Sequence, residues 1–181
     1  ELARKSGSTK IVSSDQYEFY SVWYHSAIRS IIDMYPDFTD FEMLGTLVSP
    51  PITASEAKKS VTLLERLGLI FKDADGKYHV GDKTISTGTY EKALAIANFQ
   101  RETMKLAQEA LDRVPKTERD ISTMTLGISG EALEKIQVLL QETRRKIAEI
   151  ASADPGSDRV FQLNMQLFPL SKGLTGIQGH K

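Results

Sequence analysis

The side chains best suited to chemistry in this sequence are basic and hydroxyl-bearing residues that recur along one predicted helix after Thr53. Lysine and arginine neutralise phosphates, while serine and threonine hydroxyls bond to phosphates or to base edges. At helical spacing these residues share an outward face, which comprises Ser55, Lys58, Lys59, Thr62 and Arg66. A predicted hairpin directly downstream adds Lys72, Lys77 and His79, with Lys83 just beyond. This pattern predicts a DNA-binding surface.

The charge balance of the same region predicts that this binding is weak. Between Thr53 and Gly88 there are six basic and five acidic residues, a balance of +1, and Asp73 and Asp75 lie at the hairpin tip. Because phosphate neutralisation supplies most non-specific affinity, we expect this chain alone to hold DNA weakly. The alternative is a solvated helix face on a protein-interaction or ligand-sensing module that never touches DNA.

The overall composition excludes several classes of protein. The chain has 181 residues and a net charge of −1, so it is not a strongly basic protein that coats nucleic acid. It has no cysteine, which excludes disulfides and thiolate metal sites, and its three histidines lie far apart. We therefore expect no metal and no cofactor. No apolar run approaches the ~20 residues that span a bilayer and no signal peptide is visible, so we expect a cytoplasmic protein without membrane contact.

Other candidate sites favour structural interpretations. The stretch from Gly127 to Gly130 precedes a predicted helix and could bind phosphate, but Glu131 and Glu134 would repel the anion, so Ser129 is better interpreted as a helix N-cap. No paired-carboxylate motif, nucleophile elbow or HExxH motif occurs, and we do not expect an enzyme. An aromatic group near the start is more typical of core than of an effector pocket, although a small-molecule effector stays open: Tyr17, Phe19, Tyr20, Trp23 and Tyr24.

The first half of the chain predicts a winged helix-turn-helix domain over residues 14–88, after a polar tail or linker at 1–13. One apolar-periodic helix runs from about Asp15 to Pro36, and a second from Thr39 to the Ser49-Pro50-Pro51 break. A third begins at the capping box Thr53–Glu56 and ends at Gly68. Leu69 to Lys72 and Lys77 to Val80 then form a hairpin around Asp75-Gly76.

The second half, residues 89–172, predicts a long linking helix from 89 to 114 followed by a β-α-β unit, with a tail at 173–181. Its strands are expected at 121–128 and 160–170, on either side of a helix at 131–151, and should lie parallel through a right-handed crossover. The fold class is therefore α+β. Two parallel strands are too few for an independent sheet, so this unit is expected to dimerise or to lean on the first domain.

Several short runs between residues 14 and 172 resemble a known family. They are YSVWYHSAIR (20–29), PITASEA (51–57), LGL (67–69), AQEAL (107–111), RDIST (119–123) and QLNMQLFPL (162–170). Together they are similar to a family of uncharacterised bacterial proteins known mainly from Fibrobacter- and Bdellovibrio-type genomes. The resemblance implies a winged-helix region and a C-terminal domain of unknown function. It also implies a further N-terminal segment like a repressor helix-turn-helix, which this chain, beginning at Glu1, is expected to lack.

These lines of argument lead to one functional expectation. The chain is expected to be a bacterial transcription regulator, or the regulatory and dimerising fragment of one. It would bind DNA through the winged helix or through the missing N-terminal segment, and it would form a homodimer.

Overall fold

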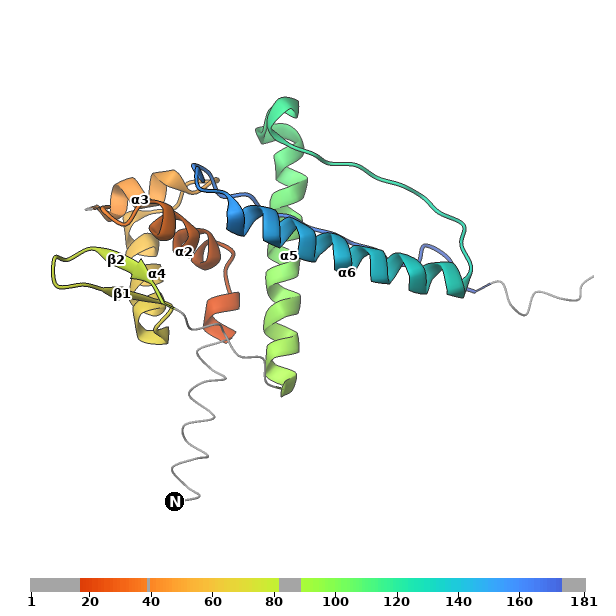
Figure 1. Cartoon of the computed structure of the whole chain (residues 1–181), viewed down its shortest axis with the longest axis horizontal. Helices are drawn as coiled ribbons and strands as arrows, with labels where there is room; N and C mark the ends of the chain where they lie inside the picture. Colours follow the sequence, from red (N-terminus) through yellow and green to blue (C-terminus); the bar gives the residue numbers. More distant parts are fainter. Residues whose placement is uncertain (1–16, 39, 82–88, 174–181) are drawn as a thin grey trace, which may run out of the picture.

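The described part of the protein consists of helices and one two-stranded sheet (Figure 1). The structure, a computed structural model, describes residues 17–38, 40–81 and 89–173, with the side chains of residues 89–93 outside the description. The elements are α2 (Tyr24–Met34), α3 (Phe41–Leu47), α4 (Ala54–Leu67), β1 (Ile70–Lys72), β2 (Tyr78–Val80), α5 (Thr89–Arg113), η1 (Lys116–Glu118) and α6 (Gly130–Ala153). The predicted α+β class is confirmed in this broad sense. The predicted tails lie outside the described residues, except for residue 173.

The ends of α4 follow the local signals in the sequence. The Thr53 hydroxyl accepts a hydrogen bond from the Glu56 backbone N–H at 3.2 Å, and the Glu56 carboxylate accepts one from the Thr53 N–H at 2.9 Å. The Thr53 hydroxyl also donates to the Glu56 carboxylate at 2.7 Å, and this bond, followed by the bond from the Thr53 N–H, lowers the pKa of Glu56. At the other end Gly68 adopts φ 67°, a left-handed conformation that glycine accepts without strain. The predicted capping box and C-terminal stop are both confirmed.

The hydrophobic core lies between α2, α3, α4 and the hairpin. α4 directs Ala57, Val61 and Leu64 into this core, where each is at most 1% exposed. They meet the fully buried side chains of Ile28, Ile32, Leu44 and Ile70. We refer to residues 17–81 as the helix–hairpin unit.

The first helix is shorter than predicted. Residues 17–20 are helical, a turn follows at 21–23, and α2 begins only at Tyr24. The Ser21 hydroxyl donates to the Glu18 carbonyl at 2.6 Å, which gives that backbone group a partner outside a regular helix. The break lets Phe19 enter the core, while the Tyr20 ring meets the Phe99 ring on α5 with centroids 5.6 Å apart. The helix therefore breaks where Phe19 packs into the core and Tyr20 packs against α5, although the apolar periodicity continues through this point. The predicted opening residue of the next helix, Thr39, lies outside the described residues, and Asp40 is the observed N-cap.

The predicted β-α-β unit does not form within one chain. Its helix is present as α6, and Ser129 is its N-cap, with the Ala132 N–H donating to the Ser129 hydroxyl at 3.2 Å, as predicted. Residues 121–128 and 160–170, however, are extended without joining any ladder, so the predicted strands are wrong for the single chain. Among the described residues the only sheet is β1–β2. A pair of parallel strands is too small to be stable alone. The alternation of apolar residues in these segments was therefore not enough to form a sheet.

Gly45 permits the close approach of α3 to the segment that precedes α4. A Cβ at this position would lie 2.5 Å from the Ile52 carbonyl oxygen, and the Ile52 N–H donates to the Gly45 carbonyl at 3.0 Å. Because the clashing atom is backbone, Gly45→Ala should destabilise the unit by about 1–3 kcal/mol, as measured by urea denaturation. Gly130→Ala is the matched control, since a Cβ there meets nothing within 4 Å. Equal stability of the two variants would contradict this account.

We expect His25 to make the stability of the core depend on pH. Its Nδ1 lies 2.8 Å from the Ser60 hydroxyl, and burial lowers its pKa to about 4, against a weaker opposing effect of Glu18. Below pH ~6.5 the unfolded chain protonates this imidazole while the folded chain does not. Stability should therefore fall between pH 6.5 and 4, by at most about 1.4 kcal/mol per pH unit from this group.

The variant His25→Asn isolates that contribution, because the amide keeps a polar atom near Ser60 but does not titrate. Denaturation midpoints measured from pH 7 to 4.5 should fall more steeply for the unmodified protein than for the variant. Parallel curves would show that His25 is not the responsible group.

Candidate nucleic-acid interface

The outward face of α4 is set by the residues on its opposite side. Since the core seals the side that carries Ala57, Val61 and Leu64, the remaining side turns to solvent. All five residues predicted to contact DNA on this helix are exposed: Ser55, Lys58, Lys59, Thr62 and Arg66. The helix therefore presents the predicted chemical groups together on one surface.

These exposed residues differ in what they contact. Arg66 forms an ion pair with Glu18, and the Thr62 hydroxyl donates to the Lys58 carbonyl of its own helix at 3.0 Å. Lys58 and Lys59 have no ion-pair partner within residues 17–38, 40–81 and 94–173, although Lys59 lowers the pKa of the nearby Glu56. On α4, Arg66 is therefore held in an ion pair within the described chain, whereas Lys58 and Lys59 are not.

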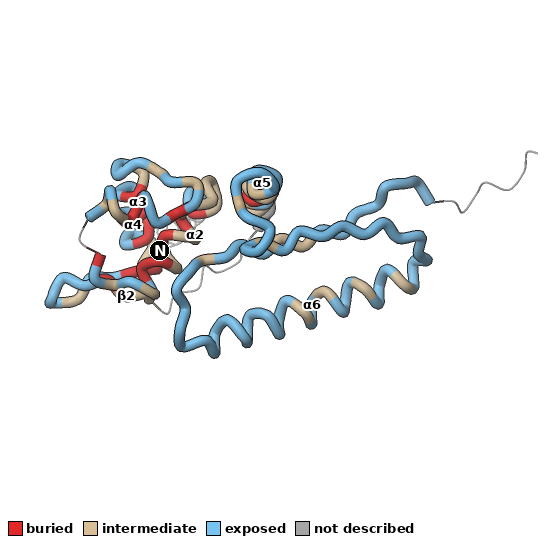
Figure 2. Tube along the Cα trace, turned by 90° about the horizontal axis from the view of Figure 1, so that it is seen from above, coloured by how far each residue is buried: buried red, intermediate tan, exposed pale blue. Residues whose placement is uncertain are grey.

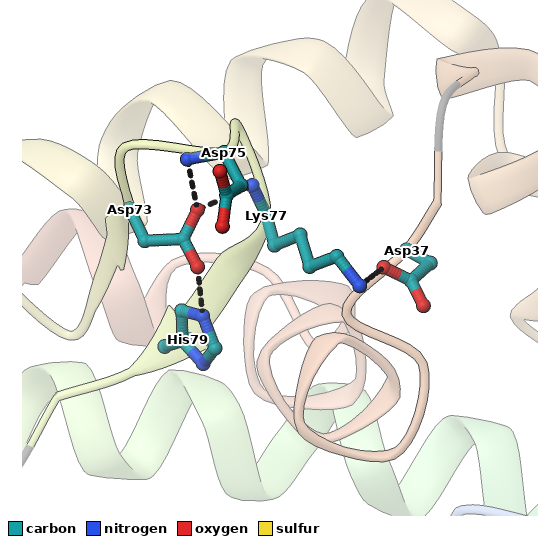
Figure 3. A network of polar contacts seen from close by, with 5 residues as sticks. All are labelled: Asp37, Asp73, Asp75, Lys77 and His79. Atoms are coloured by element: carbon teal, nitrogen blue, oxygen red, sulfur yellow. Dashed lines mark hydrogen bonds and ion pairs between the residues drawn. The ribbon is translucent and has the colours of Figure 1, made fainter.

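The hairpin forms as predicted, with Phe71 paired to His79 and Lys72 to Tyr78. Asp73 organises its turn, because its Oδ1 accepts hydrogen bonds from the backbone N–H groups of Asp75 at 3.0 Å and of Lys77 at 2.9 Å (Figure 3). Its Oδ2 lies 2.6 Å from Nε2 of His79. The contact with His79 and then the bond from the Lys77 N–H lower the pKa of Asp73. The acidic tip is thus a structural part of the turn.

The basic residues of the hairpin each contact another side chain of the protein. The Lys77 ammonium lies 2.8 Å from the Asp37 carboxylate, which raises the pKa of Lys77 (Figure 3). Lys72 lies over the Tyr78 ring at 5.0 Å from its centroid, and that ring stacks on Phe38. All three predicted hairpin residues are on the hairpin, and each of them has a local partner that competes with a phosphate. Lys83 lies outside the described residues.

Sequence reasoning missed two residues that shape this surface. Asp37 follows Pro36 in the turn after α2, and nothing in the local pattern indicates that it neutralises Lys77, which is distant in sequence. Arg29 on α2 donates to the Gly81 carbonyl at 3.4 Å, while its buried Nε has no hydrogen-bond partner among the described residues. Both contacts join segments far apart in the chain, so periodicity could not identify them.

The aromatic group near the start of the chain packs as core, as favoured from the sequence. Phe19 is buried, and Tyr20, Trp23 and Tyr24 pack against the buried cluster, whereas Tyr17 is 41% exposed. The Trp23 and Tyr24 rings meet edge to face at 5.8 Å. Burial raises the pKa values of Tyr20 and Tyr24. These contacts are those of packed side chains.

Metal-binding clusters and membrane-spanning helices are both absent from the part of the chain that the structure describes. No group of three or more histidine, aspartate or glutamate side chains there is arranged to hold a metal ion. No described helix is both long enough and apolar enough to cross a membrane.

Comparison with known proteins places the chain in a family. Searches of curated proteins and of solved structures found no match. The model of a family described as a domain of unknown function (DUF4423) matches residues 3–170. This match spans nearly the whole sequence, including the helix–hairpin unit and α6, and agrees with the resemblance to an uncharacterised family. The chain therefore belongs to the DUF4423 family.

Proposed function

We propose that the helix–hairpin unit is a winged helix-turn-helix and that the protein is a cytoplasmic bacterial transcription regulator. The observation that carries this proposal is the exposed face of α4, where Lys58 and Lys59 have no ion-pair partner among the described residues. In this arrangement α3 and α4 are the two helices of the motif, and the second enters the major groove.

Each group on the proposed surface has a specific role. Lys58 and Lys59 neutralise phosphates that flank the groove, and Ser55, in the first turn of α4, reaches base edges or phosphate. Thr62 and Arg66 extend the surface toward the end of α4, where they exchange their present contacts for DNA. Lys72, Lys77 and His79 approach the neighbouring backbone from the hairpin.

The internal ion pairs explain why this binding is weak. Lys77 gives up its contact with Asp37 before it meets a phosphate, and the acidic tip of the hairpin repels the DNA backbone. The lysines of α4 therefore supply most of the attraction, and affinity should depend strongly on salt.

The double change Lys58→Ala and Lys59→Ala tests the α4 surface. Duplex binding measured by fluorescence anisotropy at several salt concentrations should weaken for all sequences, with the log–log salt slope reduced by ~1 for each lysine that contacts a phosphate. Lys105→Ala with Lys135→Ala removes the same charge from α5 and α6 and should leave binding unchanged. Equal effects of the two double variants would reject α4 as the DNA-binding helix.

The change Asp37→Asn tests the hairpin. It releases Lys77 and removes one negative charge, so affinity should rise and the salt slope should increase by about 1 if Lys77 contacts a phosphate. In the combination Asp37→Asn with Lys77→Ala this gain should be lost. A gain that persists in the combined variant would show that Lys77 does not contact DNA.

A second candidate function is a protein-interaction or ligand-sensing module that does not bind DNA. The neutralisation of hairpin cations by Asp37 and Asp73 favours it, since a DNA-binding wing usually keeps its positive charge available. This candidate predicts no salt-dependent binding of any duplex by the unmodified protein. The anisotropy titration therefore separates the two functions before any variant is made.

A further inference from the structure

The C-terminal arm, defined here as residues 119–170, leaves its apolar side chains exposed. Figure 2 shows α6 and the extended segments on either side of it as exposed along most of their length. Met124 is 79% exposed, Phe161 71% and Leu170 76%. Other large apolar side chains of the arm are between 36% and 72% exposed: Ile121, Leu126, Ile128, Leu133, Val138, Leu139, Ile147, Ile150, Leu163, Leu167 and Phe168.

This surface is too large for an isolated soluble chain. At roughly 100 Å² for each half-exposed large side chain, the arm presents on the order of 1,000 Å² of apolar area. The largest apolar patch of a typical monomer is about 300–600 Å². One subunit of an obligate dimer buries about 1,000 Å² or more, which is the area available here.

The extended segments of the arm also lack backbone hydrogen-bond partners within the described chain. Among the described residues, no backbone hydrogen bond joins residues 121–128 or 160–170 to each other or to another element. Within residues 121–128, alternation brings Met124, Leu126 and Ile128 to one side of the segment, and threonine and glycine residues to the other. A stable sheet needs three or more strands, and the described residues of one arm supply two extended segments. A second copy brings the number to four.

The orientation of the second segment shows which side is open. The Asn164 side chain donates to the Thr103 carbonyl on α5 at 2.9 Å, so the polar side of this segment lies toward α5. Phe161, Leu163 and Leu167 alternate with that polar side and point away from it. Residues 119–170 carry six basic and seven acidic residues, so two copies meet without a large electrostatic penalty.

We propose that the C-terminal arms of two copies of this chain form a symmetric homodimer. In it the extended segments 121–128 and 160–170 of both copies pair as strands of one sheet, and the α6 helices cover its apolar side. The surface is self-complementary because each copy presents the same open strands and the same unburied apolar side chains, as an isologous interface requires. The dimer does not depend on whether the helix–hairpin unit binds DNA.

The experiment compares two charge-introducing variants of the full chain by analytical ultracentrifugation from 1 to 100 μM. Phe161→Glu places a carboxylate on the proposed interface, while Gln162→Glu places the same carboxylate on the opposite side of the same segment. Unmodified protein and Gln162→Glu should sediment with about twice the 20.2 kDa of one chain. Phe161→Glu should raise the dimer dissociation constant by at least about 30-fold. Since Phe161 is 71% exposed in the single chain, this change should leave the monomer folded.

Amide hydrogen exchange in the same samples tests strand pairing. Peptides covering 121–128 and 160–170 should exchange slowly in the dimer and rapidly in Phe161→Glu, while the peptide covering α4 should be unchanged in both. Three results would overturn the proposal: a monomer at 100 μM, equal weakening by both variants, or a dimer in which neither segment is protected. A chain that stays monomeric contradicts it even if the same surface then binds lipid vesicles or another protein.

Discussion

Burial of the inner side of α4 is the constraint on which the rest of the structure depends. Ala57, Val61 and Leu64 are sealed against α2, α3 and the hairpin, and each fully buried valine or leucine contributes roughly 1.5–3 kcal/mol. Exposed ion pairs contribute about 0–1 kcal/mol, so packing determines which side of the helix faces outward. The outward residues carry little of the fold's stability. Their lysine and hydroxyl groups can therefore contact a binding partner without loss of core packing.

In the hairpin, the contacts that hold the turn use the same charged groups that the proposed DNA binding would need. Asp73 accepts two backbone hydrogen bonds and holds His79, so the turn depends on a carboxylate at the point where a DNA-binding wing would meet phosphate. Asp37 in turn holds Lys77. The result is a hairpin in which Lys72, Lys77 and His79 each contact another side chain. This supports a proposal in which α4 provides most of the attraction and the wing a smaller share.

The C-terminal arm is organised differently from the helix–hairpin unit. Arg119 donates to the carbonyls of Ala110, Leu111 and Val114 at the end of α5, which neutralises that helix end and directs the chain away from it. The arm then continues through α6, which crosses the direction of α5 in Figure 1 and stands apart from it in Figure 2. The arm has the amphipathic patterning of a folded layer, but no second layer covers it among the residues that the structure describes. Association of two arms would supply that layer.

The sequence by itself determined the features that depend on a few neighbouring residues. These are the capping box at Thr53, the stop at Gly68, the Ser129 cap, the hairpin and the exposed set on α4, because each follows from local hydrogen bonding or from helical spacing. Only the tertiary structure decided the break after Tyr20, the neutralisation of Lys77 by Asp37 and the absence of a ladder at 121–128 and 160–170. Each of these depends on which distant segments meet. Alternation of apolar residues indicates that a segment needs another strand or layer to pack against, but it does not indicate whether the same chain supplies it.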